Sequence, residues 1–152
     1  MNELSIANVI SNKWRKMLID IKEKEELYHR ALKSLQVAVK IKPSVDGICV
    51  DATIHRFECC FELAWKLMKD CLDYEGIETN SPRACIREGW KQGMIEDAES
   101  WLDMQEKQRF IANAYDEATA IALYQLIKEK YAALLVAWDK ELQRRWESDM
   151  SN

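Results

Sequence analysis

The sequence predicts an all-α fold, an up-and-down four-helix bundle with one additional short helix, and three observations predict it. The chain of 152 residues has only four Gly and two Pro, so it lacks the turn residues of a β protein. Apolar residues recur at alternating steps of three and four, which places them on one helix face. The breaks between these stretches carry residues typical of helix ends. The length suits one domain, residues 1-152, with its core between about 14 and 146.

The first two predicted helices are the longest periodic stretches. The first ends before a turn at Pro43 to Gly47, and only Glu25 interrupts its apolar row, which consists of Trp14, Leu18, Ile21, Tyr28, Leu32, Leu35 and Val39. The second runs from about Asp51 to Glu75, with Gly76 placed to adopt a positive φ after it. Its row consists of Ile54, Phe57, Phe61, Ala64, Met68 and Cys71. These two segments predict a helical hairpin.

Three further helices follow. Ser81 and Pro82 predict the start of a short helix that stops at Gly93, because Ser accepts an orphan N–H and Pro lacks one. The next begins near Glu96 and carries Trp101, Met104, Gln108, Ile111 and Tyr115. The last begins at Asp116 as N-cap and continues as one helix, with the row Ala120, Tyr124, Ile127, Tyr131, Leu134, Trp138 and Leu142.

Charge and hydropathy exclude several classes of protein. The 22 Lys and Arg against 26 Asp and Glu give a net charge of −4, so we do not expect RNA or an anionic membrane as a ligand. No stretch approaches the roughly 18 apolar residues of a membrane span, and the N-terminus lacks a signal sequence. We expect a cytoplasmic protein, in which the five Cys, including the adjacent Cys59 and Cys60, pack as small buried residues.

The residues that carry chemistry are sparse. The only His are His29 and His55, on different predicted helices, and we expect surface or interhelical contacts rather than metal ligation. No Gly-rich phosphate loop is present, and no base is marked for the Cys residues. The sequence therefore predicts no metal, no cofactor and no catalytic residue of its own. Four tryptophans on or beside apolar rows are expected in the core, namely Trp14, Trp65, Trp101 and Trp138.

Two polar groupings leave alternatives open. Arg56, Glu58 and Glu62 lie on overlapping faces of the second helix, and they form either solvated i,i+4 pairs, as Glu62 and Lys66 would, or a buried functional network. Trp146 follows Arg144 and Arg145 beyond the last clear apolar row, and it either contacts a partner or belongs to a frayed helix end.

The amino-acid sequence of the central helices resembles that of a known family. The ordered set consists of RFE at Arg56 to Glu58, FELAWK at Phe61 to Lys66, SPR at Ser81 to Arg83, WLDM at Trp101 to Met104 and YDE at Tyr115 to Glu117. It resembles the nucleotidyltransferase substrate-binding proteins of the HEPN superfamily, which are related to HepT-type toxins, over roughly residues 14 to 140. The resemblance implies a helical homodimer that binds a separately encoded minimal nucleotidyltransferase of the DNA polymerase β type and helps to hold its nucleotide or small-molecule substrate.

In the toxin branch of that family the bundle is instead a metal-independent ribonuclease with an R-x4-H-x-Y motif. Aligned through WLDM and YDE, this chain has Gln108 at the Arg position and Asn113 at the His position, and only Tyr115 matches. Gln carries no charge and Asn does not titrate near neutral pH, so this pair reproduces neither the phosphate-stabilising cation nor the proton-transfer group.

Two residues of this window keep two interpretations each. Arg109, about 100° around the helix from Gln108, either binds a phosphate or partner carboxylate together with Asn113 or is a solvated Arg near a helix end. Tyr115 either matches the hydroxyl that partner enzymes modify or closes the core.

The resulting hypothesis is a non-catalytic helical subunit that dimerises and contributes to the substrate site of a cognate nucleotidyltransferase. We expect the window from Gln108 to Tyr115 to lie near the two-fold axis, because HEPN sites form between protomers. The alternative is a HepT-like ribonuclease of a toxin–antitoxin pair with a degenerate motif.

Overall fold

The fold is helical throughout the described part of the chain. The computed structural model describes residues 3–111 and 116–150, with side chains described over 5–109 and 116–148. No strand occurs among these residues, so the predicted all-α class is confirmed. The elements in chain order are α1 (Glu3–Lys40), α2 (Ile48–Tyr74), α3 (Pro82–Lys91), α4 (Ala98–Ile111), α5 (Glu117–Leu126), the π-helical turn η1 (Ile127–Tyr131) and α6 (Ala132–Met150).

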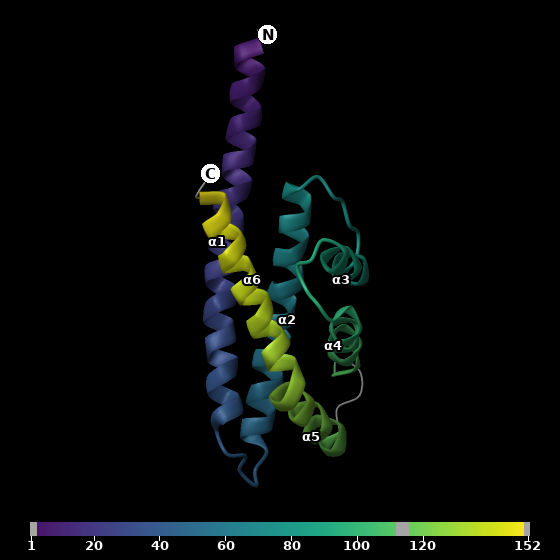
Figure 1. The fold of residues 1–152 in the computed structure, drawn as a ribbon. Helices are drawn as coiled ribbons and strands as arrows, with labels where there is room; N and C mark the ends of the chain where they lie inside the picture. The colour runs from purple at the N-terminus through teal and green to yellow at the C-terminus, as the bar shows by residue number, and fades with distance from the viewer. Residues whose placement is uncertain (1–2, 112–115, 151–152) are drawn as a thin grey trace.

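The long helices run lengthwise beside one another, and the short ones lie across them. In Figure 1, α1 descends, α2 returns, α3 and α4 step down beside α2 and are seen nearly end-on, and α5 to α6 ascends again. The chain therefore alternates in direction as an up-and-down bundle does. The leg made of α3 and α4 is broken into helices of 10 and 14 residues that cross the others.

The helix ends predicted at Ser81, Asp116 and Gly76 form as expected. Ser81 Oγ accepts a hydrogen bond from Ala84 N at 3.1 Å, and Pro82 occupies the first position of α3. Asp116 caps α5 by accepting hydrogen bonds from the backbone N and the hydroxyl of Thr119. Gly76 has φ 82°, as expected after α2, because only Gly adopts this conformation without a steric penalty.

The last helix differs from the prediction. Instead of one regular helix there are five π-helical residues between α5 and α6. A π turn holds one more residue than an α turn, so side chains on either side of it are rotated relative to a regular helix. Just beyond it, the Tyr28 hydroxyl of α1 donates to the Leu135 carbonyl at 2.5 Å. Six members of the predicted row are buried, namely Ala120, Tyr124, Ile127, Tyr131, Trp138 and Leu142. Leu134, just after the π turn, is only half-buried, and its neighbour Leu135 is fully buried instead.

The core lies where α2 meets α1 and the α5–α6 leg. Phe57 stacks on Tyr131 with ring centroids 5.6 Å apart, and Phe61 lies 6.3 Å from Trp101 of α4. The Trp138 indole N–H donates to the Ala64 carbonyl at 3.1 Å. The predicted burial of Trp101 and Trp138 is confirmed, and Trp65 is half-buried.

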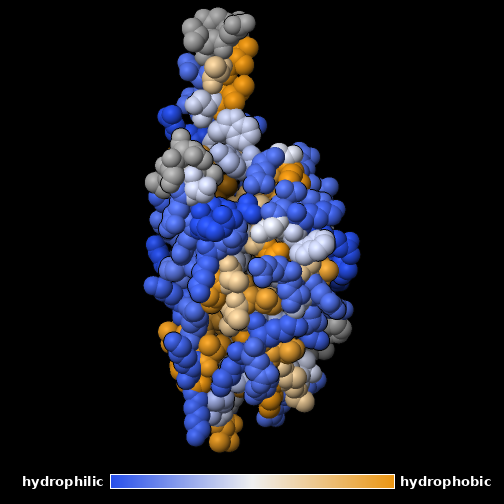
Figure 2. Space-filling model, in the orientation of Figure 1, coloured by the Kyte–Doolittle hydropathy of each residue, from blue (hydrophilic) through white to orange (hydrophobic). Residues whose placement is uncertain are grey.

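The prediction that Trp14 is a core residue is wrong. Helix α1 begins at Glu3, earlier than predicted, and its first turns extend past the other helices, as Figure 1 shows. Trp14 is 40% exposed and contacts only the edge of the body, in a T-shaped pair with Tyr74 at 5.4 Å. Figure 2 shows hydrophobic side chains along one side of this projecting segment, among which Ile6, Val9 and Ile10 are exposed. We call residues 5–16 the N-terminal arm.

Candidate functional site

Gln108 and Arg109, the first residues of the window that distinguishes the two family branches, lie at the end of α4. Gln108 is half-buried and Arg109 is exposed in the last turn of the helix. Their directions differ by about 100°, so Arg109 does not point where Gln108 points. Asn113 and Tyr115 lie outside the described residues. Among the described side chains, the window therefore presents one exposed guanidinium and one half-buried amide.

Two of the motifs meet at a hollow between α3, α4 and η1, which we call the motif hollow. Arg83 of SPR and Asp103 of WLDM both line it, and its volume is about 570 Å³. Lys130 of η1 adds a second cation, and the remaining lining residues are Asp97, Glu99, Ser100, Leu102 and Glu106. The π turn thus contributes to this hollow directly. The fold brings together two motifs that the sequence places about twenty residues apart.

Hydrogen bonds hold two of the carboxylates that line the motif hollow, Asp97 and Asp103. Tyr131, buried beneath it, donates its hydroxyl to Asp103. Asp97 accepts hydrogen bonds from the backbone N and hydroxyl of Ser100, which lower the pKa of Asp97. Asp97 therefore stays ionised and caps the first turn of α4. These residues serve to hold α4 in place against η1.

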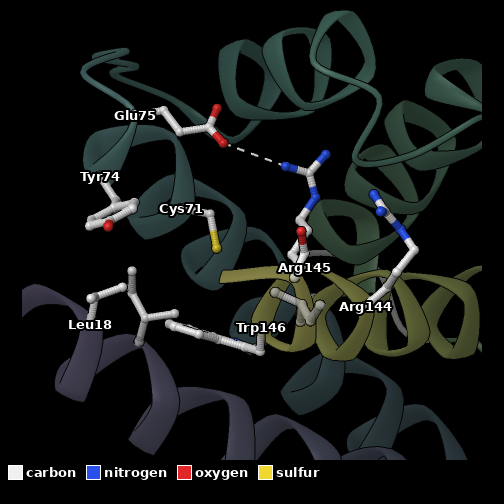
Figure 3. A pocket seen from close by; sticks show the side chains of 10 residues that line it. Leu18, Cys71, Tyr74, Glu75, Arg144, Arg145 and Trp146 are labelled. Carbon is white, nitrogen blue, oxygen red and sulfur yellow. Dashed lines mark hydrogen bonds and ion pairs between the residues drawn. The ribbon is translucent and has the colours of Figure 1, made fainter. Parts of the chain in front are cut away.

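A second hollow, the arginine hollow, lies between α1, α2 and α6. Figure 3 shows Trp146 and Leu18 on one side, Tyr74 and Cys71 on another, and the two guanidinium groups of Arg144 and Arg145 at its edge. Its volume is about 300 Å³, and Ile21, Glu75, Leu142 and Ser148 complete the lining. Trp146, for which the sequence leaves two interpretations, is half-buried in this hollow and packs against the core.

The guanidinium groups of the arginine hollow are held by carboxylates. Arg144 donates to both oxygens of Glu141, at 2.9 and 2.5 Å, and this contact lowers the pKa of Glu141. Arg145 also donates to Glu141, reaches Glu75 at 3.5 Å and donates to the Gln92 carbonyl at 3.1 Å. Arg145 thus ties α6 to the ends of α2 and α3. Arg144, with a side chain 66% exposed, remains accessible to a ligand.

The side chains of the arginine hollow are suited to binding a ligand rather than to catalysing a reaction. Burial raises the pKa of the Cys71 thiol to about 12, so the thiol is neutral and a poor nucleophile. An indole, a phenol and an accessible guanidinium suit a planar anionic group through stacking and charge-assisted hydrogen bonds.

Of the three polar residues predicted on α2, Arg56 and Glu62 have separate partners. Arg56 donates to the Ser34 carbonyl of α1 at 2.8 Å. Glu62 accepts from the Trp65 indole at 2.9 Å and pairs with Lys66 at 3.5 Å, as the spacing predicts. Burial raises the pKa of Glu58. Among the described residues no hydrogen bond joins Arg56, Glu58 and Glu62 to one another, so each contact there is local or ties α2 to α1.

Two predictions on His and Cys have different outcomes. His29 forms the expected interhelical contact, with its Nδ1 2.8 Å from Asp139 of α6. The expected burial of Cys59 is wrong, because Cys60 occupies the inward position and Cys59, one residue earlier, faces outward. Cys59 Sγ lies 3.8 Å from His55, a neighbour one turn back that was not expected from the sequence. In the part of the chain described, no three His, Cys, Asp or Glu side chains converge as metal ligands.

Glu25, the residue that interrupts the apolar row of α1, supports a pH-dependent prediction. Burial, and next the Asp139 carboxylate, raise its pKa. A Glu with a raised pKa binds more protons folded than unfolded, so stability falls as pH rises from its unfolded pKa through its folded pKa and stays lowered at higher pH. We expect Glu25→Gln to raise the urea midpoint at pH 7 and to have no such effect near pH 4.

The control for this prediction is Glu78→Gln, a change at an exposed carboxylate that should leave the midpoint unchanged at both pH values. A Glu25→Gln gain that is equal at pH 4 and pH 7 would contradict the electrostatic cause.

The comparisons with known proteins identify the family. The model of the nucleotidyltransferase substrate binding protein like family matches residues 23–144, which include all of α2 to α5, about half of α1 and most of α6. The chain belongs to this family. The recognised motifs therefore have the family context that the sequence suggests.

Two similar proteins, one curated relative and one solved structure, are consistent with this family assignment. The chain is 28% identical over 95 residues to the probable ribonuclease HepT of Haemophilus influenzae, and the match covers 59% of this chain. The matched part of this chain spans 65% of the length of the Haemophilus influenzae relative. A crystal structure of a protein from Thermus thermophilus shares 30% identity with a TM-score of 0.67, over 77% of this chain and 97% of that chain.

The family assignment leaves the arginine hollow as the feature that sequence reasoning missed. Its lining comes from three segments, around residues 18, 74 and 145, that are distant in sequence. The only local signal was the unusual Arg-Arg-Trp run at the end of the last helix.

No helix within residues 3–111 and 116–150 is long and apolar enough to cross a membrane.

Proposed function

We propose that this protein is a non-catalytic helical subunit, a HEPN-type bundle, that dimerises and binds a separately encoded minimal nucleotidyltransferase. In this proposal it supplies part of the substrate site of that enzyme. The observation that carries the proposal is the family match over residues 23–144, whose description names substrate binding for a nucleotidyltransferase. The arginine hollow supports it, because its side chains offer binding contacts and its thiol is neutral.

Binding of the cognate enzyme is tested by co-purification. The tagged chain, co-expressed with the minimal nucleotidyltransferase encoded beside it, should retain that enzyme through affinity and size-exclusion steps. Since Arg109 is an exposed cation at the end of α4, Arg109→Glu should weaken retention at least tenfold, a change of about 1.4 kcal/mol.

The matched control is Arg87→Glu, the same charge reversal at an exposed site on α3. A wild-type chain that does not retain the nucleotidyltransferase would refute the proposal. An equal loss of retention for Arg109→Glu and Arg87→Glu would refute the role of Arg109.

The substrate contact is tested in the reconstituted complex. Arg144→Ala removes the accessible guanidinium of the arginine hollow, so the KM for the substrate should rise about tenfold with kcat nearly unchanged. Arg15→Ala, on the exposed N-terminal arm, should leave both constants unaffected. A fall in kcat alone, or no change, would place the substrate elsewhere.

A second candidate function is the HepT-like ribonuclease, which the Haemophilus influenzae relative favours. It would use Arg109 with a base other than Asn113. It predicts that the purified chain, free of its partner, cleaves RNA and that Arg109→Ala abolishes the cleavage. Intact RNA after incubation with the purified chain would remove this candidate.

A further inference from the structure

A third hollow lies at the end of the bundle away from the N-terminus, between the turn that joins α1 to α2 and the start of α5 (Figure 1). We call it the acidic hollow. Its lining comes from residues 43–51 and 116–125, and its volume is about 520 Å³, which is within the range of small-molecule sites. It shares no lining residue with the arginine hollow or the motif hollow.

Every charged side chain that lines the acidic hollow is an acid, namely Asp46, Asp51, Asp116 and Glu117. Hydrogen bonds from the Ser44 hydroxyl and from the backbone N of Ile48 lower the pKa of Asp46. Hydrogen bonds from the backbone N and the hydroxyl of Thr119 lower the pKa of Asp116 in the same way. Both carboxylates are therefore ionised at neutral pH. A concave surface of one sign concentrates ligands of the opposite charge, so the acidic hollow favours a cation.

The arrangement of the carboxylates favours an organic cation over a metal ion. Within residues 5–109 and 116–148, no three His, Cys, Asp or Glu side chains are placed to hold a metal ion. Apolar side chains, among them Val50, Ala120 and Ile121, share the lining with the acids. A metal ion requires several oxygen ligands around one point. An organic cation instead places its charge near the carboxylates and its carbon skeleton on the apolar side chains.

Tyr124 gives independent evidence for a ligand. Its side chain lies in the wall of the acidic hollow, and the residue is only 1% exposed. The buried hydroxyl has no hydrogen-bond partner among the described residues, whereas the hydroxyls of Tyr28 and Tyr131 each have one. A buried hydroxyl without a partner lowers stability, so such groups are rare in folded proteins. A ligand N–H would supply the missing hydrogen bond, because a phenol oxygen accepts as well as donates.

We propose that the acidic hollow binds an organic amine, a compound with at least one ammonium group on an apolar body. An ammonium N–H donates to the Tyr124 hydroxyl, and the Tyr124 ring attracts the same cation. The apolar body lies on Val50 and Ile121, and Glu117 with the other carboxylates balances the positive charge. Amine binding here does not depend on the nucleotidyltransferase, so failure of either proposal leaves the other standing.

Calorimetric titration of the full chain tests the site with two matched compounds. The probe is para-xylylenediamine, which carries an ammonium group on each side of a ring, and the control is para-xylylene glycol, its neutral diol counterpart. We expect the diamine to bind with a Kd below about 1 mM at low salt and the diol to bind at least tenfold more weakly.

Three variants locate the bound diamine. Tyr124→Phe changes no charge and should weaken diamine binding about tenfold, because it removes the hydroxyl that accepts from the ammonium group. Glu117→Gln should weaken it about threefold. Glu78→Gln removes an exposed carboxylate outside the acidic hollow and should leave the Kd unchanged.

The ligand-free chain gives a second measurement on Tyr124. Tyr124→Phe removes a buried hydroxyl that has no partner, so it should raise the urea midpoint of the free chain while it weakens binding. A hydroxyl with a purely structural role would give a lower midpoint, and that result would overturn the role of Tyr124. Absence of diamine binding, equal binding of diamine and diol, or equal binding by wild type and Tyr124→Phe would overturn the site.

Discussion

Replacing Trp138 by alanine is expected to lower the free energy of unfolding by about 3–5 kcal/mol. The indole is 1% exposed, lies against the core from α6 and donates its N–H to the Ala64 carbonyl of α2. Truncation removes the apolar area, leaves a cavity and deprives that carbonyl of its side-chain partner. Because a domain of this kind is stable by only about 5–15 kcal/mol, we expect partial unfolding near physiological temperature.

Urea unfolding followed by circular dichroism measures this effect. Trp138→Phe should cost less than Trp138→Ala, since it retains an aromatic ring and loses mainly the indole N–H. Trp90→Ala on α3 is the control, and its cost should be within about 0.5 kcal/mol because the side chain is 53% exposed. Equal losses for Trp138→Ala and Trp90→Ala would contradict the assigned core.

Replacing Gly89 by valine is expected to cost about 1–3 kcal/mol. Gly89 is buried in α3 where that helix crosses α2. A Cβ at this position would overlap the Sδ atom of Met68 and lie 3.2 Å from its Cγ. Met68 is fully buried, so it has little room to move, and α3 must shift away from α2. That shift would also move Arg83 and the motif hollow.

A double-mutant cycle isolates this contact. Met68→Ala alone should cost about 2–5 kcal/mol, and it opens the space that a valine at position 89 would fill. We expect the double variant to be more stable than the sum of the single effects predicts, by about 1–2 kcal/mol. Gly93→Ala separates backbone strain from crowding. A Cβ added at Gly93 would meet no atom within 4 Å, but the backbone there has φ 75°. Strict additivity at positions 68 and 89 would rule out the crowding.

Local signals of the sequence predicted much of the fold. The 3–4 periodicity placed five helical segments, and the caps at Ser81 and Asp116 and the turn at Gly76 are as expected. These features depend on residues within a few positions of one another, which is why one sequence contains them. Periodicity did not show the π turn, because one extra residue leaves each flanking row regular.

Errors arose where burial depends on distant partners. Trp14 continues the apolar row of α1, yet it is 40% exposed because only the end of α2, at Tyr74, reaches its level. Cys59 and Cys60 are equally apolar, and only the packing direction of α2 decides which is buried. The arginine hollow and the His29–Asp139 contact each join residues that are more than fifty positions apart.

The sequence by itself determined the helical class, the helix ends and, through its ordered motifs, the family. These follow from backbone propensity, capping and periodicity, all of which act locally. Only the tertiary structure decided which apolar faces are covered, that Arg83 and Asp103 line one hollow, and that Trp146 lines another beside two guanidinium groups. Burial and electrostatic pairing depend on the distances between side chains, and those distances are set when the helices pack.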